Sequence, residues 1–201
     1  MQRAIPTSPL ATLYADIAAY GTALSDEDWK QFAGQCSEVR FDKRSEVFTQ
    51  ARKQSAILFV ASGICAAQLT LPDGHTVISR FFESKNVCSV VEFQYAGQPA
   101  RNSIVTVTPV EGALIPIKVW GLNQFEGGPL ARYVRQKMFR QHLFDIDMLH
   151  MKTMNRTEVA YEFLKERHPS VLKEAPQTVI AQFCGITPEG YSRFLKNYSN
   201  R

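Results

Sequence analysis

The sequence predicts an α+β protein: a cupin-like jelly-roll or β-roll, one long connecting helix, and a small helical domain with a helix-turn-helix. Short β-branched and apolar runs alternate with turn residues from about residue 38 to 118. Residues 130–151 then contain no Gly or Pro. Residues 176–196 read as two short helices around a glycine turn. We therefore expect three parts, at residues 1–128, 129–152 and 153–201.

The first part is expected to form the β-roll. A short helix precedes the strands, because Ser25 can cap it and Trp29, Phe32 and Cys36 share one face. The clearest hairpin turns at residues 72–75, where Pro, Asp and Gly each favour a turn. The runs with strand character are Val39–Phe41, Glu46–Thr49, Ala56–Val60, Ile64–Leu71, Thr76–Phe82, Ile104–Val107 and Ala113–Ile117.

The most informative stretch is the C-terminal helix pair. Gly185 provides the left-handed turn residue, and Thr187 with Pro188 can start the second helix. This helix has an apolar stripe of Tyr191, Phe194, Leu195 and Tyr198 and an opposite polar stripe of Glu189, Ser192, Arg193 and Lys196. Arginine can bind guanine bidentately and glutamate can accept from cytosine, so the polar stripe is typical of a DNA-reading helix. The alternative is an ordinary surface helical hairpin.

The long helix carries an apolar seam that begins with Leu130, Val134 and Met138. A helix that joins two domains often pairs with its own copy across a two-fold axis. We therefore expect these three residues to form a homodimer interface. The alternative is a helix packed wholly on its own roll. Residues 155–158 then offer a capping-box-like start for a helix that supports the helix-turn-helix.

The charge distribution differs between the two halves of the chain. Residues 1–128 hold 11 Lys and Arg against 12 Asp and Glu, whereas residues 129–201 hold 12 against 7. A neutral sensing part joined to a part that binds a polyanion would give this distribution, and so would a solvated helical face. Residues 1–128 contribute little to the net charge of +4.

Cysteine and histidine spacing argues against metal chemistry and against an enzyme. The four cysteines, Cys36, Cys65, Cys88 and Cys184, show no CxxC spacing, so we expect buried free thiols. A cupin-type enzyme would need clustered ligands, yet His75 is the only histidine before residue 142. His142, His150 and His168 are expected to be surface or packing residues. We expect no catalytic residues, no metal and no cofactor.

The sequence shows no secretory leader pattern and no run of about 18 apolar residues. We therefore expect a cytoplasmic protein that does not enter a membrane.

A roll, a long helix and a C-terminal helix-turn-helix in this order resemble the Crp/Fnr family of bacterial transcription regulators. The most specific residues run from Arg156 to Pro169 and continue through Pro176-Gln177, Ile180-Ala181, Gly185 to Glu189 and Ser192-Arg193. The resemblance implies a homodimeric regulator of the short-tailed type that binds double-stranded DNA, with a roll that senses a small-molecule effector of unknown identity. The candidate DNA contacts are Gln177, Thr178, Thr187, Glu189, Ser192, Arg193 and Lys196.

The roll departs from the family members that bind cyclic nucleotides. Those members use a Gly-Glu pair, and the matching stretch here reads Ser89-Val90. Valine cannot accept a hydrogen bond from a ribose hydroxyl, so we expect no response to cyclic AMP or cyclic GMP. The resemblance implies a candidate effector pocket at Phe82, Ser89, Val90, Arg101, Asn102 and Ser103.

The second departure lies in the DNA-reading helix. Gly190 stands where the family usually has a bulkier residue, and Leu195 stands where short-tailed relatives often carry a basic one. These two residues keep an alternative open. The protein would then be a degenerate family member, a dimeric module that binds a ligand or a protein without sequence-specific DNA binding.

Overall fold

The computed structural model describes residues 8–88, 99–120 and 130–200. The labelled strands are β1 (Ser37–Phe41), β2 (Glu46–Phe48), β3 (Ala56–Ser62), β4 (Cys65–Thr70), β5 (Thr76–Phe82), β6 (Val87–Cys88), β7 (Ser103–Thr106) and β8 (Val110–Pro116). The labelled helices are α1 (Pro9–Ala19), α2 (Asp26–Ala33), α5 (Ala131–Thr153), α6 (Thr157–Arg167), α7 (Pro169–Glu174), α8 (Gln177–Cys184) and α9 (Pro188–Ser199).

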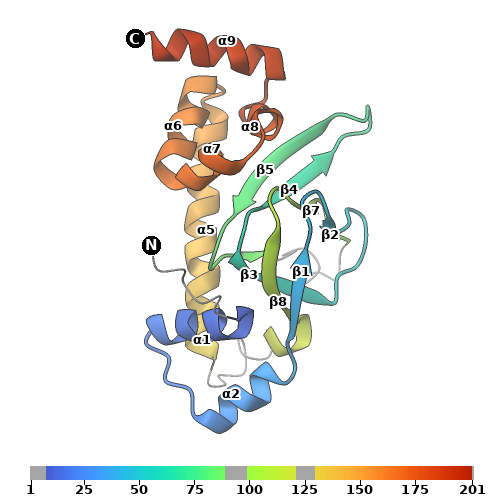
Figure 1. Cartoon of the computed structure of the whole chain (residues 1–201), viewed down its shortest axis with the longest axis vertical. Helices are drawn as coiled ribbons and strands as arrows, with labels where there is room; N and C mark the ends of the chain where they lie inside the picture. Colours follow the sequence, from blue (N-terminus) through green and yellow to red (C-terminus); the bar gives the residue numbers. More distant parts are fainter. Residues whose placement is uncertain (1–7, 89–98, 121–129, 201) are drawn as a thin grey trace.

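Two four-stranded antiparallel sheets, in the orders β1-β8-β3-β6 and β2-β7-β4-β5, form a roll. The long helix α5 runs beside the roll, and α6 to α9 gather at one end of it (Figure 1). Helices α1 and α2 lie at the opposite end (Figure 1). This architecture confirms the predicted α+β fold class with a β-roll, a long helix and a helical C-terminal part.

Most elements follow from local sequence signals. Ser25 caps α2 by accepting a hydrogen bond from the amide of Asp28, as expected. The hairpin between β4 and β5 turns where it was predicted: the amide of Leu71 donates to the carbonyl of His75 at 2.8 Å. Gly74 has a φ of 85° there, which only glycine adopts readily. The sequence did not predict α1, α7 or the two-residue strand β6.

Three apolar clusters hold the chain together. The roll core lies between the two sheets and includes Phe48, Leu58, Cys65, Phe82, Cys88 and Ile104. The base cluster joins α1, α2 and the first half of α5 to the outer side of β3 and β8, with Leu13, Ile17, Phe59, Ile115 and Trp120 among its members. The junction cluster joins the roll to the C-terminal helices and includes Ile78, Phe81, Met148, Leu164, Ile180 and Phe183.

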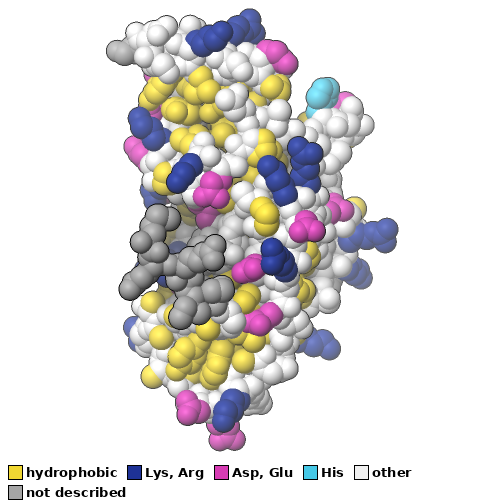
Figure 2. Space-filling view, in the orientation of Figure 1, with side chains coloured by type: hydrophobic (Ala, Val, Ile, Leu, Met, Phe, Trp, Pro, Cys, Tyr) yellow, Lys and Arg dark blue, Asp and Glu magenta, His cyan; other side chains and the backbone are white. Residues whose placement is uncertain are grey.

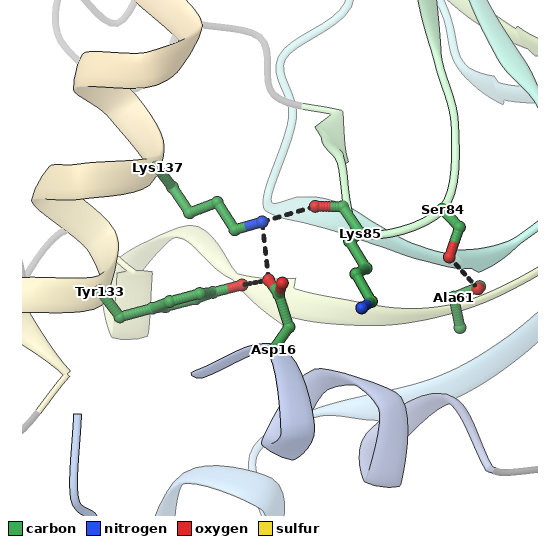
Figure 3. Close-up of polar contacts among 6 residues, drawn as sticks. All are labelled: Asp16, Ala61, Ser84, Lys85, Tyr133 and Lys137. Carbon is green, nitrogen blue, oxygen red and sulfur yellow. Dashed lines mark hydrogen bonds and ion pairs between the residues drawn. The ribbon is translucent and has the colours of Figure 1, made fainter. Parts of the chain in front are cut away.

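A buried polar network fixes the first half of α5 to the roll (Figure 3). The ammonium of Lys137 lies 2.6 Å from the carboxylate of Asp16 on α1 and donates to the carbonyl of Lys85 at 2.6 Å. The hydroxyl of Tyr133 donates to the same Asp16 carboxylate at 2.8 Å. Burial raises the pKa of Tyr133, so its hydroxyl stays a donor. Each of these buried groups therefore has a partner, as burial requires.

Two sequence-based expectations about the helices need correction. Leu130 and Val134 are only 3% and 1% exposed in a single chain, and Met138 packs partly against the same base cluster. Their burial therefore does not support an exposed seam at these residues. Helix α6 has Arg156 as its N-cap, without a side-chain capping bond, rather than a capping box at Asn155. Asn155 instead adopts a left-handed turn with a φ of 46°.

Candidate nucleic-acid interface

Helices α8 and α9 form the predicted helix-turn-helix. Gly185 ends α8 in the left-handed conformation, with a φ of 71° and a ψ of 28°. Thr187 then caps α9, because its hydroxyl accepts a hydrogen bond from the amide of Gly190 at 3.1 Å. Pro188 occupies the first turn of α9, where a missing amide hydrogen costs nothing. The local signals in the sequence therefore fix both the corner and the start of α9.

The inner face of α9 is aromatic and packs on α6. The ring centroid of Tyr161 on α6 lies 5.4 Å from that of Phe194 and 5.0 Å from that of Tyr198, both on α9. Tyr191 is buried in the junction cluster. The hydroxyl of Tyr198 donates to the carboxylate of Glu162, which fixes the far end of α9 to α6. Aromatic pairs at such distances add to the free energy gained from burial.

The outer face of α9 is polar and open to solvent. Glu189, Ser192, Arg193 and Lys196 are all exposed, and so are Gln177 and Thr178 at the start of α8 and Thr187 between the helices. In the orientation of Figure 1, α9 crosses one end of the molecule, and Figure 2 shows Lys and Arg side chains at this end as well as farther along the same face. The hydroxyl of Ser192 donates to the carbonyl of Pro188 at 3.1 Å and can still accept another bond. All seven predicted DNA contacts are thus accessible to a large partner.

The two unusual residues of α9 have structural reasons. A Cβ on Gly190 would lie 3.3 Å from the Thr187 hydroxyl oxygen, so glycine leaves room for the cap. Leu195 packs partly against the junction cluster. It therefore lies on the inner side of the helix rather than among the exposed polar residues.

The sequence did not predict how closely α8 docks on the roll. Strand β5 runs beside α8 in Figure 1. The side-chain amide of Gln182 donates to the Thr76 hydroxyl at 2.9 Å, and the rings of Phe81 and Phe183 lie 5.2 Å apart. Gln182 is a polar residue on a short helix, so no local sequence signal pointed to a contact with a strand about 100 residues earlier.

Charged contacts surround this docking site. Arg80 on β5 pairs with Asp145 on α5, and its guanidinium lies 4.7 Å from the centre of the Phe144 ring. Burial lowers the pKa of Arg80, and the charge of Asp145 opposes this effect. Lys152 donates to the carbonyl of Phe183 near the C-terminus of α8, where a cation is favourable for the helix dipole.

The candidate effector residues are only partly placed. Phe82 and Ser103 are buried, whereas Asn102 is half-buried and Arg101 is exposed. The hydroxyl of Ser103 donates to Glu46 at 2.6 Å and accepts from the amide of Gln50 at 2.9 Å, so its bonds serve the roll itself. Ser89 and Val90 lie outside the described residues.

The second half of α5 carries an exposed apolar face. Phe139, Leu143, Ile146 and Leu149 are 63%, 47%, 37% and 62% exposed, respectively. This face lies on the side of α5 away from Val134 and Met148, which are buried. An exposed apolar row of this length is unusual on a monomer.

The cysteines do not form disulfides, and the described residues show neither a metal site nor a membrane-spanning helix. The four cysteines are free; Cys65 and Cys88 are buried as expected, whereas Cys36 and Cys184 are half-buried. Among the described side chains, no three His, Cys, Asp or Glu gather as a metal site would require. Within the described ranges, no helix combines the length and apolar character needed to cross a membrane.

The chain is similar to known proteins in structure but matches none by sequence. No family model and no curated protein matches the sequence. The c-di-GMP-responsive global regulator CLP of Xanthomonas campestris matches with a TM-score of 0.67 and 18% identity, over 85% of this chain and 90% of that chain. A putative transcriptional regulator of the Crp/Fnr family from Eubacterium rectale matches with a TM-score of 0.65 and 15% identity, over 88% and 84% of the two chains.

A cyclic nucleotide-binding domain containing protein from Listeria monocytogenes matches as well, with a TM-score of 0.65 and 15% identity over 92% of this chain and 89% of that chain. These matches extend from the roll into the C-terminal helices, because they cover most of both chains. The chain therefore has the fold of the Crp/Fnr transcriptional regulators over most of its length.

Proposed function

We propose that this protein is a DNA-binding transcriptional regulator that acts as a homodimer and is not an enzyme. The observation that carries the proposal is the two-sided helix α9: its inner face is held on α6 by aromatic packing, and Glu189, Ser192, Arg193 and Lys196 lie exposed on its outer face. In this proposal, residues 1–128 form the sensor, residues 129–152 the dimerisation helix and residues 153–201 the DNA-binding part.

The exposed face of α5 supports a two-fold dimer. Phe139, Leu143 and Ile146 are spaced i, i+4 and i+7, which is the spacing of a coiled-coil seam. Leu130 and Val134, which the sequence suggested for this role, are already covered by their own chain. We expect Leu143→Asp to give a monomer in sedimentation at micromolar concentration. Tyr14→Asp, which changes an exposed residue on α1, serves as the matched control and should leave a dimer.

Two basic residues of α9 have different roles in this proposal. Arg193 lies near the middle of the exposed stripe and contacts a base edge, whereas Lys196 lies about one turn farther on and contacts phosphate. The two α9 helices of the dimer enter successive major grooves about one helical turn apart. Gln177, Thr178 and Thr187 then lie at exposed helix ends, where contacts to the DNA backbone fit.

The experiment begins with selection of bound sequences from a random DNA library. Affinity for the best sequence is then measured across salt concentrations. Arg193→Ala should cost about 1–3 kcal/mol and relax the base preference, whereas Lys196→Ala should weaken all sequences alike and lower the salt slope by about 1.

Arg40→Ala is the control, because it removes an exposed positive charge from strand β1 and should change neither quantity. If the library yields no preferred sequence, or if both α9 variants bind as the wild type does, the reading role of α9 is wrong. The degenerate binding module would then be the better account.

We also propose that the roll senses an effector other than a cyclic nucleotide. A ligand that binds only the folded state raises the melting temperature. We expect no shift of Tm with millimolar cyclic AMP or cyclic GMP, because Ser89-Val90 lacks the carboxylate that a ribose hydroxyl needs. A dose-dependent rise that Arg101→Ala abolishes would contradict this expectation.

A further inference from the structure

The DNA-reading helices are joined to the roll by an apolar contact that does not fix their orientation by itself. Strand β5 has a bulge at Ser79, because Gln68 pairs with Ile78 and Ala67 pairs with Arg80. The extra residue breaks the alternation of the strand, and both Ile78 and Phe81 belong to the junction cluster. Hydrophobic contact has no preferred direction, so helices packed on these two side chains could settle at more than one angle.

Two hydrogen bonds across the same junction have a direction. The side-chain amide of Gln182 on α8 donates to the hydroxyl of Thr76 at the start of β5, at 2.9 Å. The Nδ1 atom of His168 donates to the carboxylate of Glu83, the residue directly after β5. The two bonds therefore hold the C-terminal helices at both ends of one strand of the roll.

His168 lies where a shift of Glu83 can be passed on to the C-terminal helices. It lies at the corner between α6 and α7: its amide donates to the carbonyl of Leu164 at 2.7 Å, and its own carbonyl accepts from the amide of Val171 at 3.0 Å. His168 is 5% exposed, and its ring lies within about 6 Å of the rings of Phe81 and Phe144. A shift of Glu83 would therefore move the corner that carries the helix-turn-helix.

The cost of this pair argues that it serves orientation rather than stability. The Nε2 atom of His168 is buried and has no hydrogen-bond partner within the described part of the chain. An apolar side chain of similar size at this corner would avoid that unsatisfied group. Buried polar pairs can favour one arrangement among several packed alternatives, although they add little net stability.

We propose that Thr76 and Glu83 of the roll are positioning residues for DNA reading. Neither lies on the exposed face of α9, and both act through Gln182 and His168 on the angle of the helix-turn-helix. In a homodimer, this angle sets the distance between the two reading helices. The inference rests on the proposed function, since it concerns how a DNA-binding dimer places its two halves.

The test measures which half-site spacing the full-length protein prefers. Two copies of the half-site selected by the wild type are separated by spacers that differ by single base pairs, and affinity is measured for each. We expect Thr76→Val and Glu83→Ala to reduce the preference for the best spacing about fivefold or more, the lower end of typical coupling between distant sites. The base preference within one half-site should stay as in the wild type, because α9 itself is unchanged.

Two controls match these variants. Thr76→Ser keeps the hydroxyl that Gln182 binds, and Glu111→Ala removes an exposed carboxylate elsewhere on the roll. Both should keep the wild-type spacing profile. If Glu83→Ala does not fold, the comparison of Thr76→Val with Thr76→Ser decides.

Folded Thr76→Val and Glu83→Ala variants with the wild-type spacing profile would overturn the inference and leave the proposed function intact. A wild type that binds no DNA would overturn both. An altered base preference within one half-site would also count against the inference, since it would mean that the substitutions disturb α9 itself.

Discussion

The roll core and the junction cluster are both apolar, but they differ in what surrounds them. The roll core is built from side chains such as Leu58, Cys65 and Phe82, and its members carry no charge. The junction cluster is bordered by the Arg80 and Asp145 pair, by the Glu83 and His168 pair, and by the bonds from Lys152 and Gln182 to their partners. These polar contacts lie where two parts of the molecule meet, whereas the buried hydroxyls of Ser103 and Thr106 bond to other residues of the roll.

The two clusters therefore have different roles: one closes the roll, and the other joins the roll to helices at a defined angle. Apolar burial between two sheets is enough to close the roll, since the strand registers already fix the geometry. Helices that dock on a strand have no shared ladder of backbone bonds, and their angle needs directional contacts. In this chain, the side-chain bonds between the roll and the docked helices are therefore the ones placed to fix an orientation.

The largest effect is expected from a cavity in the junction. Phe81→Ala should cost about 3–5 kcal/mol of stability, because a buried phenyl ring is lost beside Phe183. Trp29 and Trp120 both belong to the base cluster, so their fluorescence follows that end of the molecule, whereas far-UV circular dichroism follows mainly the helices. The unfolding transitions followed by the two signals should coincide in the wild type and occur separately in Phe81→Ala. Coincident transitions in the variant would contradict the junction's role in joining the two parts.

A somewhat smaller effect is expected from the network in Figure 3. Lys137→Met leaves the buried Asp16 carboxylate without its counter-charge, and such losses cost about 3–5 kcal/mol. We expect the lower end of that range, because the Tyr133 hydroxyl still donates to Asp16. Denaturant titration measures the loss. Unlike Phe81→Ala, this variant should keep a single transition, and two transitions would show that α5 rather than the junction couples the parts.

A smaller effect is expected at the start of α9. Thr187→Ala removes the cap on the amide of Gly190 and should cost about 1 kcal/mol. Thr187→Ala is combined with Phe81→Ala, in which the C-terminal helices unfold separately. The loss of stability should then appear in the transition followed by circular dichroism and not in the transition followed by tryptophan fluorescence. Equal shifts in both signals would mean that α9 is not an independent part of that transition.

The smallest perturbation is thiol labelling, which compares the two clusters in the wild type. Burial raises the pKa of the Cys184 thiol to about 11, and the thiolate is the reactive form. Its alkylation should therefore be slow at pH 8 and speed up about tenfold per pH unit until the pH approaches 11. Cys65 and Cys88 are fully buried in the roll core and should react only when the chain unfolds. Alkylation of each thiol is followed by peptide mass spectrometry. The same rate for all three thiols would contradict the expected difference in accessibility between the two clusters.

The helix-turn-helix could be predicted because its signals are local. The turn at Gly185, the cap at Thr187 and the two stripes of α9 each depend on residues within a few positions of one another. The hairpin between β4 and β5 was predictable for the same reason. The start of α1 also carries local signals, a cap at Ser8 and Pro9 in the first turn, which the interpretation of the sequence missed.

The junction could not be predicted, since its contacts join residues far apart in the chain. Nothing local relates Gln182 to Thr76 or His168 to Glu83. The choice of residues for the apolar seam of α5 depended on distant contacts in the same way. Apolar spacing shows that Leu130 and Val134 are buried, but it does not show against what, and here their own roll covers them.

The most direct test of the account maps where α9 meets DNA. A DNA-cleaving iron chelate is attached at Ser192→Cys, in a chain whose half-buried Cys36 and Cys184 are replaced by serine, and the protein is bound to its selected DNA site. Cleavage should occur in two regions with centres about 10 base pairs apart, because a two-fold dimer places α9 in successive major grooves. The same chelate at Ser37→Cys on the roll should not cut in these regions. A single cleaved region, or no cleavage from Ser192→Cys on DNA that the protein still binds, would contradict a dimer that reads DNA through α9.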